Sequence, residues 1–252
     1  MYPVLFRIGQ FEITSFGVLV AIGALVGMWI FARELRRSGL PDDAVDCAFA
    51  GVIGGMVGAK LLWVMEHAGS GPLADLLWSR SGMSWFGGLV GGLLAGLAMM
   101  HRRRLPAMAV VSAAAPGLVV GHAIGRIGCF LVGDDYGWPT DLPWGVAFPE
   151  GLPPTTVRVH PTQLYEALAL VPLALLLLRW RRQGRPAHVV VGGYLVLAGA
   201  IRFGIEFVRV HEPVIGGLAV AHLAALLAVL AGTVLLYAGR TREVRAVDVP
   251  PR

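Results

Sequence analysis

Long stretches without charged residues are the feature that most constrains the fold of this chain. A helix needs about 20 mostly apolar residues to cross a bilayer. Four uncharged runs have that length: 13–32, 81–100, 105–125 and 213–239. Three more stretches reach it by admitting a few ionisable residues: 44–65, 163–178 and 186–208. We therefore expect an all-α integral membrane protein with seven transmembrane helices.

The composition excludes other classes of protein. Charged residues make up 15% of the chain, against roughly 25% in soluble proteins. That content is too low to cover a water-exposed surface, which argues against a disordered chain and an ordinary cytosolic enzyme. Two cysteines, both in apolar stretches, also argue against a disulfide-stapled secreted domain.

The arginines predict the orientation of the helices. With the N-terminus outside, the outer segments hold three cations, Arg7, Arg80 and Arg158, and the inner segments hold fourteen. The inner cations are Arg33, Arg36, Arg37, Arg102, Arg103, Arg104, Arg179, Arg181, Arg182, Arg185, Arg240, Arg242, Arg245 and Arg252. Because cytoplasmic loops carry an excess of Lys and Arg, we predict an outer N-terminus and an inner C-terminus. Residues 1–240 then form one membrane domain, and 241–252 form a cytoplasmic tail.

The largest outer segment, 134–162, differs in composition from the predicted spans. It contains six prolines, which argue against a long helix. Its aromatic residues Tyr136, Trp138, Trp144 and Phe148 suit the headgroup level of a bilayer. We predict a small head segment on the outer membrane surface. A loose extracellular loop is the alternative.

A few ionisable residues fall within or at the ends of the predicted spans, where they are costly and usually functional. In the predicted orientation Lys60, Arg126 and Arg202 all lie towards the outer side. Glu206 and Arg209 follow Arg202 at helical spacing, and Asp134 and Asp135 follow Arg126. One interpretation is a structural network of ion pairs. The other is a phosphate site, because the cations outnumber the nearby carboxylates and Arg binds phosphate bidentately.

Glycines recur at small-xxx-small spacing in two of the predicted spans. They are Gly51, Gly54, Gly55 and Gly58 in one span, and Gly87, Gly88, Gly91 and Gly92 in the other. This spacing predicts close helix packing. A phosphate-binding loop would require a preceding strand, which the pattern does not predict.

Several segments, in order along residues 5–240, resemble the motifs of the bacterial prolipoprotein diacylglyceryl transferases. The segment GRIGCFLVGDDYG at 125–137 resembles the family signature GRxGNFxNGExxG. The other matching segments are SWFGG at 84–88, WG at 144–145 with FP at 148–149, HPTQLYE at 160–166, and RFGIEFVR at 202–209.

This resemblance implies an enzyme that transfers the diacylglyceryl group of phosphatidylglycerol to the lipobox cysteine of lipoprotein precursors, releasing glycerol phosphate. It implies that Arg126 and Arg202 bind the lipid phosphate, that Glu206 orients Arg202, and that Gly137 lets the head segment approach the substrate. Lys60, Asp134 and Arg209 are further candidates for substrate binding. The expected location is the bacterial inner membrane, with the active site facing the outer leaflet. We expect no cofactor, metal or nucleic acid.

The chain departs from the family motifs at several positions. Phe86 stands where the family has a histidine that accepts the thiol proton, and Cys129 replaces the signature asparagine. Phe16 and Ala198 stand where tyrosines are usual, and Lys60 replaces an arginine. For Cys129, a small packing residue is a better interpretation than a covalent nucleophile.

The missing histidine leaves the thiol without its usual base, which can cost about 10²–10⁴ in rate. His122, one turn before Arg126, and His160, at the outer entrance, are the candidate substitutes. For each, a structural role is the alternative. Two other functions remain open. One is a divergent member that binds phosphatidylglycerol but serves another acceptor or none. The other is an anion or lipid transporter, although transporters often show repeats that are not evident here.

Overall fold

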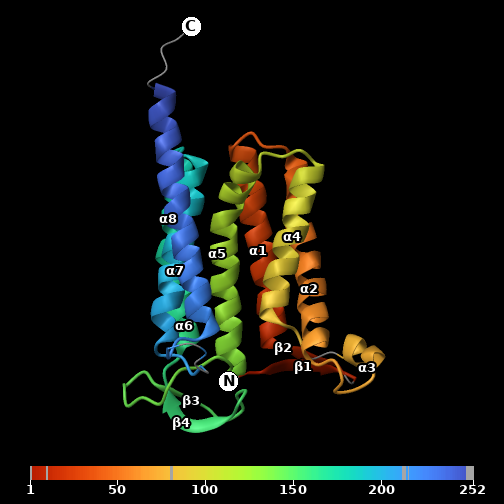
Figure 1. The fold of residues 1–252 in the computed structure, drawn as a ribbon. Helices are drawn as coiled ribbons and strands as arrows, with labels where there is room; N and C mark the ends of the chain where they lie inside the picture. The colour runs from red at the N-terminus through yellow and green to blue at the C-terminus, as the bar shows by residue number, and fades with distance from the viewer. Residues whose placement is uncertain (1, 10, 80–81, 212–213, 215, 248–252) are drawn as a thin grey trace. The chain divides into compact units, whose positions relative to one another are not determined.

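The structure is a computed structural model that describes residues 2–9, 11–79, 82–211, 214 and 216–247. Arg80 and Arg252, two of the cations counted above, therefore lie outside the described residues. In chain order the elements are β1 (Val4–Ile8), β2 (Phe11–Thr14), α1 (Ser15–Arg37), a 3-10 turn (Asp42–Val45), α2 (Asp46–Glu66), α3 (Leu73–Trp78), α4 (Trp85–Arg102), α5 (Ala107–Val132), β3 (Val146–Phe148), β4 (Thr155–Val159), α6 (Thr162–Arg182), α7 (Ala187–Glu206) and α8 (Val220–Val247) (Figure 1).

Among the described residues, six segments are long and apolar enough to cross a membrane. They are Ser15–Arg37, Asp42–Glu66, Ala107–Val132, Thr162–Arg182, Ala187–Glu206 and Val220–Thr241. They support an integral, multi-pass membrane protein, as the uncharged runs predict. The expected span 81–100 overlaps α4, which is not among these six segments. Helix α4 has 18 residues and ends in the polar residues His101 and Arg102.

Two predicted boundaries are wrong in detail. Helix α5 continues past residue 125 to Val132, so Arg126 lies inside it and Asp134 and Asp135 lie beyond its end. Helix α7 ends at Glu206, so Arg209 is outside the helix rather than on its face. Helix α8 runs on to Val247, and the cytoplasmic tail from residue 241 stays a prediction.

The chain forms two compact units, Met1–Phe31 with Val111–Arg252, and Ala32–Val110. The core of the first unit lies among α5, α6 and α7, which contribute the fully buried Ala115, Val119, Leu177 and Val190. Side chains pack tightly there because all three helices are apolar along most of their length. This core holds α5, α6 and α7 together, and ion pairs connect the start of α6 with the last turns of α5 and α7.

Glycine contacts bring helices together within each unit. In the second unit, a Cβ on Gly58 would lie 2.3 Å from the carbonyl oxygen of Gly87, and one on Gly91 would lie 2.4 Å from that of Gly54. The predicted packing role of these glycines in α2 and α4 is confirmed. Glycines also allow close packing of two helices in the first unit. A Cβ on Gly117 of α5 would lie 2.4 Å from the carbonyl oxygen of Gly27 in α1.

Residues 133–161, all of which the structure describes, form no helix, as their prolines predict. They contain the antiparallel pair β3–β4, in which Val146 faces Val159. Phe148 is fully buried and stacks on Tyr136 with ring centroids 5.5 Å apart. Phe148 therefore forms the small core of the head segment and is not available to contact lipid. Trp138 and Trp144 are about half exposed, and their place at the headgroup level stays a prediction.

Candidate functional site

The candidate site is built on Glu166, a carboxylate in the second turn of α6. Its side chain is 2% exposed. The Nε of Arg126, from α5, lies 2.9 Å from its Oε2. Nη1 of Arg202, from α7, donates to the same oxygen at 3.3 Å. One buried carboxylate therefore holds together two arginines that are 76 residues apart in the sequence.

Two further carboxylates connect these arginines to Arg209. Oε2 of Glu206 lies 2.8 Å from Nη2 of Arg202 and accepts a hydrogen bond from Nη1 of Arg209 at 3.4 Å. Asp135 accepts a hydrogen bond from Nη1 of Arg126 at 3.0 Å and another from Nη2 of Arg209. Arginines and carboxylates thus alternate around a closed circuit. We call this set of residues the charge ring: Arg126, Glu166, Arg202, Glu206, Arg209 and Asp135.

The charge ring corrects one expectation from the sequence. Its three arginines face three carboxylates, so the expected excess of cations over nearby carboxylates is wrong for the described residues. Pairing also explains how these charges are tolerated, because buried charges without partners are strongly disfavoured. Three donors of the ring are still buried without a hydrogen-bond partner among the described residues: Nε and Nη2 of Arg126 and Nε of Arg209.

The loop after α5 places Asp135 in the ring. The backbone of Asp135 has a φ of 58°, a left-handed conformation that aspartate adopts more readily than most residues. The hydroxyl of Thr162 donates to its carbonyl oxygen at 2.6 Å, and the amide of Gln163 donates to the carbonyl oxygen of Asp134. The start of α6 therefore fixes the loop backbone from outside the ring.

The two aspartates of this loop differ in their electrostatics. Burial would raise the pKa of Asp135, but the guanidinium groups of Arg209 and Arg126 outweigh it and hold that pKa below its usual range. Burial, together with the nearby charge of Asp135, raises the pKa of Asp134. Asp135 therefore holds its negative charge more readily than Asp134 does.

Cys129 contacts the ring without belonging to it. Its Sγ accepts a hydrogen bond from Nη1 of Arg126 at 3.3 Å. Cys129, Asp134 and Asp135 offer ligand atoms within 4.8 Å of one another, which is a spacing that can hold a metal ion. Arg126 donates to two of the three, however, so the group already has a cation of the chain as its partner. A packing role that also helps to orient Arg126 suits the sulfur best.

The two candidate bases have different surroundings. Nε2 of His122 lies 3.4 Å from Oε1 of Glu166, and the His122 side chain is 51% exposed. Nδ1 of His160 lies 3.1 Å from the hydroxyl of Tyr165, which also accepts a hydrogen bond from Trp144 at 2.8 Å. His122 therefore adjoins the charge ring, whereas His160 is part of the packing of the head segment.

Two other predicted site residues have clear structural surroundings. Lys60 lies in the other compact unit, where its Nζ donates to the carbonyl oxygen and the hydroxyl of Ser79, both at 2.8 Å. Its part in a phosphate site remains a prediction. A Cβ on Gly137 would lie 2.3 Å from the carbonyl oxygen of Val208, so this glycine lets the head segment approach the chain just after α7.

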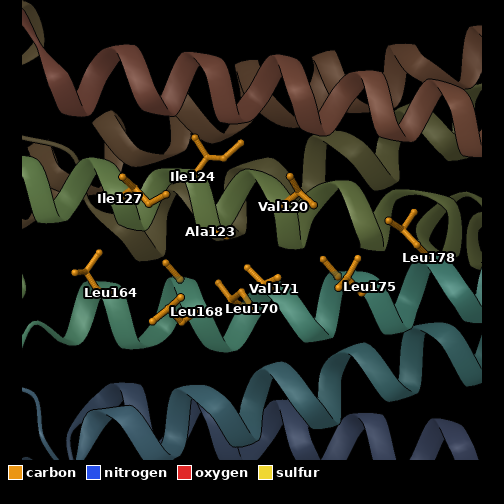
Figure 2. Close-up of a pocket in the computed structure, with 12 residues that line it drawn as sticks. Val120, Ala123, Ile124, Ile127, Leu164, Leu168, Leu170, Val171, Leu175 and Leu178 are labelled. Atoms are coloured by element: carbon orange, nitrogen blue, oxygen red, sulfur yellow. The ribbon is translucent and has the colours of Figure 1, made fainter.

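An apolar cavity of about 380 Å³ lies between α5 and α6. Figure 2 shows its lining side chains between the two helices, with Ile127 from α5 and Leu164 from α6 towards one end. Ile127 directly follows Arg126 of the charge ring in the sequence, and Ala167, which also lines the cavity, directly follows Glu166. Leu168, Val171 and Leu175 line the cavity and are half or more exposed, so the cavity is open at its side.

Reasoning from the sequence missed two members of the ring, Glu166 and Asp135, as site residues. The signal for Glu166 was present, because it is a carboxylate within an apolar stretch of spanning length. Asp135 gave a weaker signal, since it lies in a polar loop beside Asp134.

Comparisons with known proteins found one matching family model and several similar proteins. A family model described as prolipoprotein diacylglyceryl transferase matches residues 3–238. The chain is 37% identical over 225 residues to the phosphatidylglycerol–prolipoprotein diacylglyceryl transferase of Geobacter sulfurreducens, covering 86% of this chain and 85% of that protein. It is 33% identical over 257 residues to the protein of the same name from Methylococcus capsulatus, covering 96% of each chain. A third such protein, from Nitratidesulfovibrio vulgaris, is 36% identical over 226 residues, covering 86% of this chain and 84% of that protein.

Proposed function

The chain belongs to the prolipoprotein diacylglyceryl transferase family, and we propose that it transfers the diacylglyceryl group of phosphatidylglycerol to the lipobox cysteine of lipoprotein precursors. The observation that carries this proposal is the shared anchoring of Arg126 and Arg202 by the buried Glu166. Two forked cations held at a fixed separation suit the oxygens of a phosphate.

The reaction places charge where the arginines are. The thiol sulfur of the acceptor bonds to the glyceryl carbon that carries the phosphate, and the carbon–oxygen bond breaks. The bonding electrons remain on the phosphate oxygen. The phosphodiester of the lipid carries one negative charge, and the glycerol phosphate that leaves carries two. Arg126 and Arg202 stabilise this developing charge without reorganising, since Glu166 and Glu206 already orient them.

The apolar cavity between α5 and α6 would hold an acyl chain of the lipid. Its lining is apolar, and two of its lining residues, Ile127 and Ala167, directly follow Arg126 and Glu166 of the charge ring in the sequence (Figure 2). Each buried methylene contributes about 0.8 kcal/mol. The half-exposed Leu168 and Leu175 would let a chain enter from the side, along the bilayer.

His122 is the better candidate to accept the thiol proton in place of the histidine that Phe86 replaces. Its imidazole is half exposed and lies beside Glu166, whose carboxylate orients the ring and stabilises the imidazolium. His160 would position Tyr165 and the head segment.

The site would face the outer leaflet of the bacterial inner membrane, where both phosphatidylglycerol and translocated precursors are accessible. In this arrangement α4 is a seventh span, the N-terminus is outside and the C-terminus is inside. The excess of arginines in the inner segments supports this orientation.

The experiment that tests the function uses purified protein, phosphatidylglycerol and a lipobox peptide. We expect a diacylglyceryl peptide and an equal amount of glycerol phosphate by mass spectrometry. A peptide with serine in place of cysteine is the matched control and should stay unmodified. Absence of both products would overturn the proposal. Lipid binding without transfer would indicate the divergent alternative, which complementation of a strain lacking its transferase tests independently.

A further inference from the structure

We propose that Asp135 is the exchangeable anion of the charge ring: the substrate phosphate takes over its contacts with Arg126 and Arg209, and its carboxylate later displaces the phosphate product. This inference rests on the proposed function and adds a positioning residue that controls product release. It concerns a position that the family signature leaves open, between the acidic residue and the final glycine.

Asp135 differs from the other two carboxylates of the ring in exposure. Its side chain is 36% exposed, whereas those of Glu166 and Glu206 are 2% exposed. An anion arriving from outside the protein can reach the first and not the others.

The contacts of Asp135 leave its side chain free to move while its backbone stays in place. Thr162 and Gln163 hold the carbonyl oxygens of Asp135 and Asp134, and neither contacts the carboxylate. Rotation about the side-chain bonds is therefore enough to release Arg126 and Arg209. The phosphate would then meet two guanidinium groups that are already separated by the span of a small oxyanion.

The charges favour exchange in both directions. With Asp135 in place the ring is neutral, and a diester that replaces it keeps the charge of the ring unchanged. After transfer the phosphate carries a second negative charge, which three arginines would hold tightly. Asp135 remains next to Arg126 and Arg209, and competition from its carboxylate shortens the time for which the product stays bound.

Substitution of Asp135→Asn tests this inference, because asparagine keeps the size of the side chain and tolerates a positive φ. We expect the variant to bind glycerol phosphate about tenfold more tightly than the wild type in a calorimetric titration, since it lacks a competing charge-assisted contact. The inhibition constant of glycerol phosphate in the transfer assay should fall by the same factor. Asp141→Asn, an exposed position in the head segment, is the matched control and should change neither value.

Equal or weaker binding of glycerol phosphate by the Asp135→Asn variant would overturn the inference. If that variant does not fold, Asp135→Gly, which also accepts a positive φ, replaces it with the same expectation. The binding measurement needs no turnover. Tighter binding by the variant, with no transfer by the wild type, would refute the proposed function and support this inference. Transfer by the wild type, with unchanged binding by the variant, would refute this inference alone.

Discussion

Substitution of Glu166→Gln gives the sharpest test of the charge ring. Glutamine keeps the shape of the side chain but removes the charge that Arg126 and Arg202 share at 2.9 and 3.3 Å. Hydrogen bonds to charged groups contribute about 1.5–3 kcal/mol, and neutral ones about 1 kcal/mol. Neutralising the hydrogen bond from Arg202 and the ion pair with Nε of Arg126 therefore costs between roughly 1 and 4 kcal/mol in total.

That loss should appear mainly in catalysis, because the reacting phosphate gains charge only in the transition state. We expect kcat/KM to fall between roughly fivefold and almost a thousandfold, and most of the fall to be in kcat. The assay is diacylglyceryl transfer to a lipobox peptide, with thermal unfolding in detergent measured in parallel. Glu150→Gln, an exposed position in the head segment, is the matched control and should leave both values unchanged.

Two outcomes would refute the reasoning. If Glu166→Gln keeps kcat/KM within about twofold of the wild type, the shared carboxylate does not set the positions of the arginines. If the variant loses activity through KM alone, the arginines bind the lipid equally well before and during the reaction, and the argument from developing charge is wrong.

Three further predictions concern the surroundings of the ring. His122→Gln should lower kcat about 10²–10⁴-fold near neutral pH, and kcat should recover at higher pH as the thiol ionises unaided. His160→Gln should not show this recovery. The pH–rate profiles of both variants test this difference. Ala123→Phe should fill the cavity and raise KM about tenfold for long-chain phosphatidylglycerol but not for a short-chain analogue; equal effects on both lipids would contradict an acyl-chain site. Burial and the charge of Asp135 raise the pKa of Asp134, so the neutral acid favours folding and this contribution is lost as pH rises through the folded pKa. Asp134→Asn should therefore raise the melting temperature near neutral pH but not near pH 4, and a pH-independent difference would contradict it.

The helices were predictable because a bilayer constrains them so strongly. Backbone groups in hydrocarbon must be bonded within the segment, so long apolar runs become helices almost regardless of their neighbours. The end of α5 shows where this reasoning fails. The charge of Arg126 ends the uncharged run, yet the helix continues to Val132, because Glu166 and Asp135 compensate the charge. A hydropathy pattern cannot include a partner that is 40 residues away.

The site was predictable as a group of residues but not as an arrangement. The motifs and the cost of charge in a membrane single out Arg126, Arg202 and Glu206, and the structure brings all three into one ring. The contact of Asp135 depends on a left-handed backbone and on clamping by Thr162, and neither can be derived from local sequence.

The neutrality of the ring gives a physical reason for a site that binds anions yet contains as many carboxylates as arginines. Three unpaired guanidinium groups at this depth would carry a large desolvation cost, which would favour rearrangement of the helices that hold them. Glu166 and Glu206 compensate part of that charge permanently from buried positions, and Asp135 compensates the remainder from an exposed one. Phosphate then enters by replacing one carboxylate, so the charge of the site changes little until the second negative charge develops on the leaving group. The positive and negative charges of the site are least well matched at that moment. The return of Asp135 to Arg126 and Arg209 restores neutrality as the product leaves.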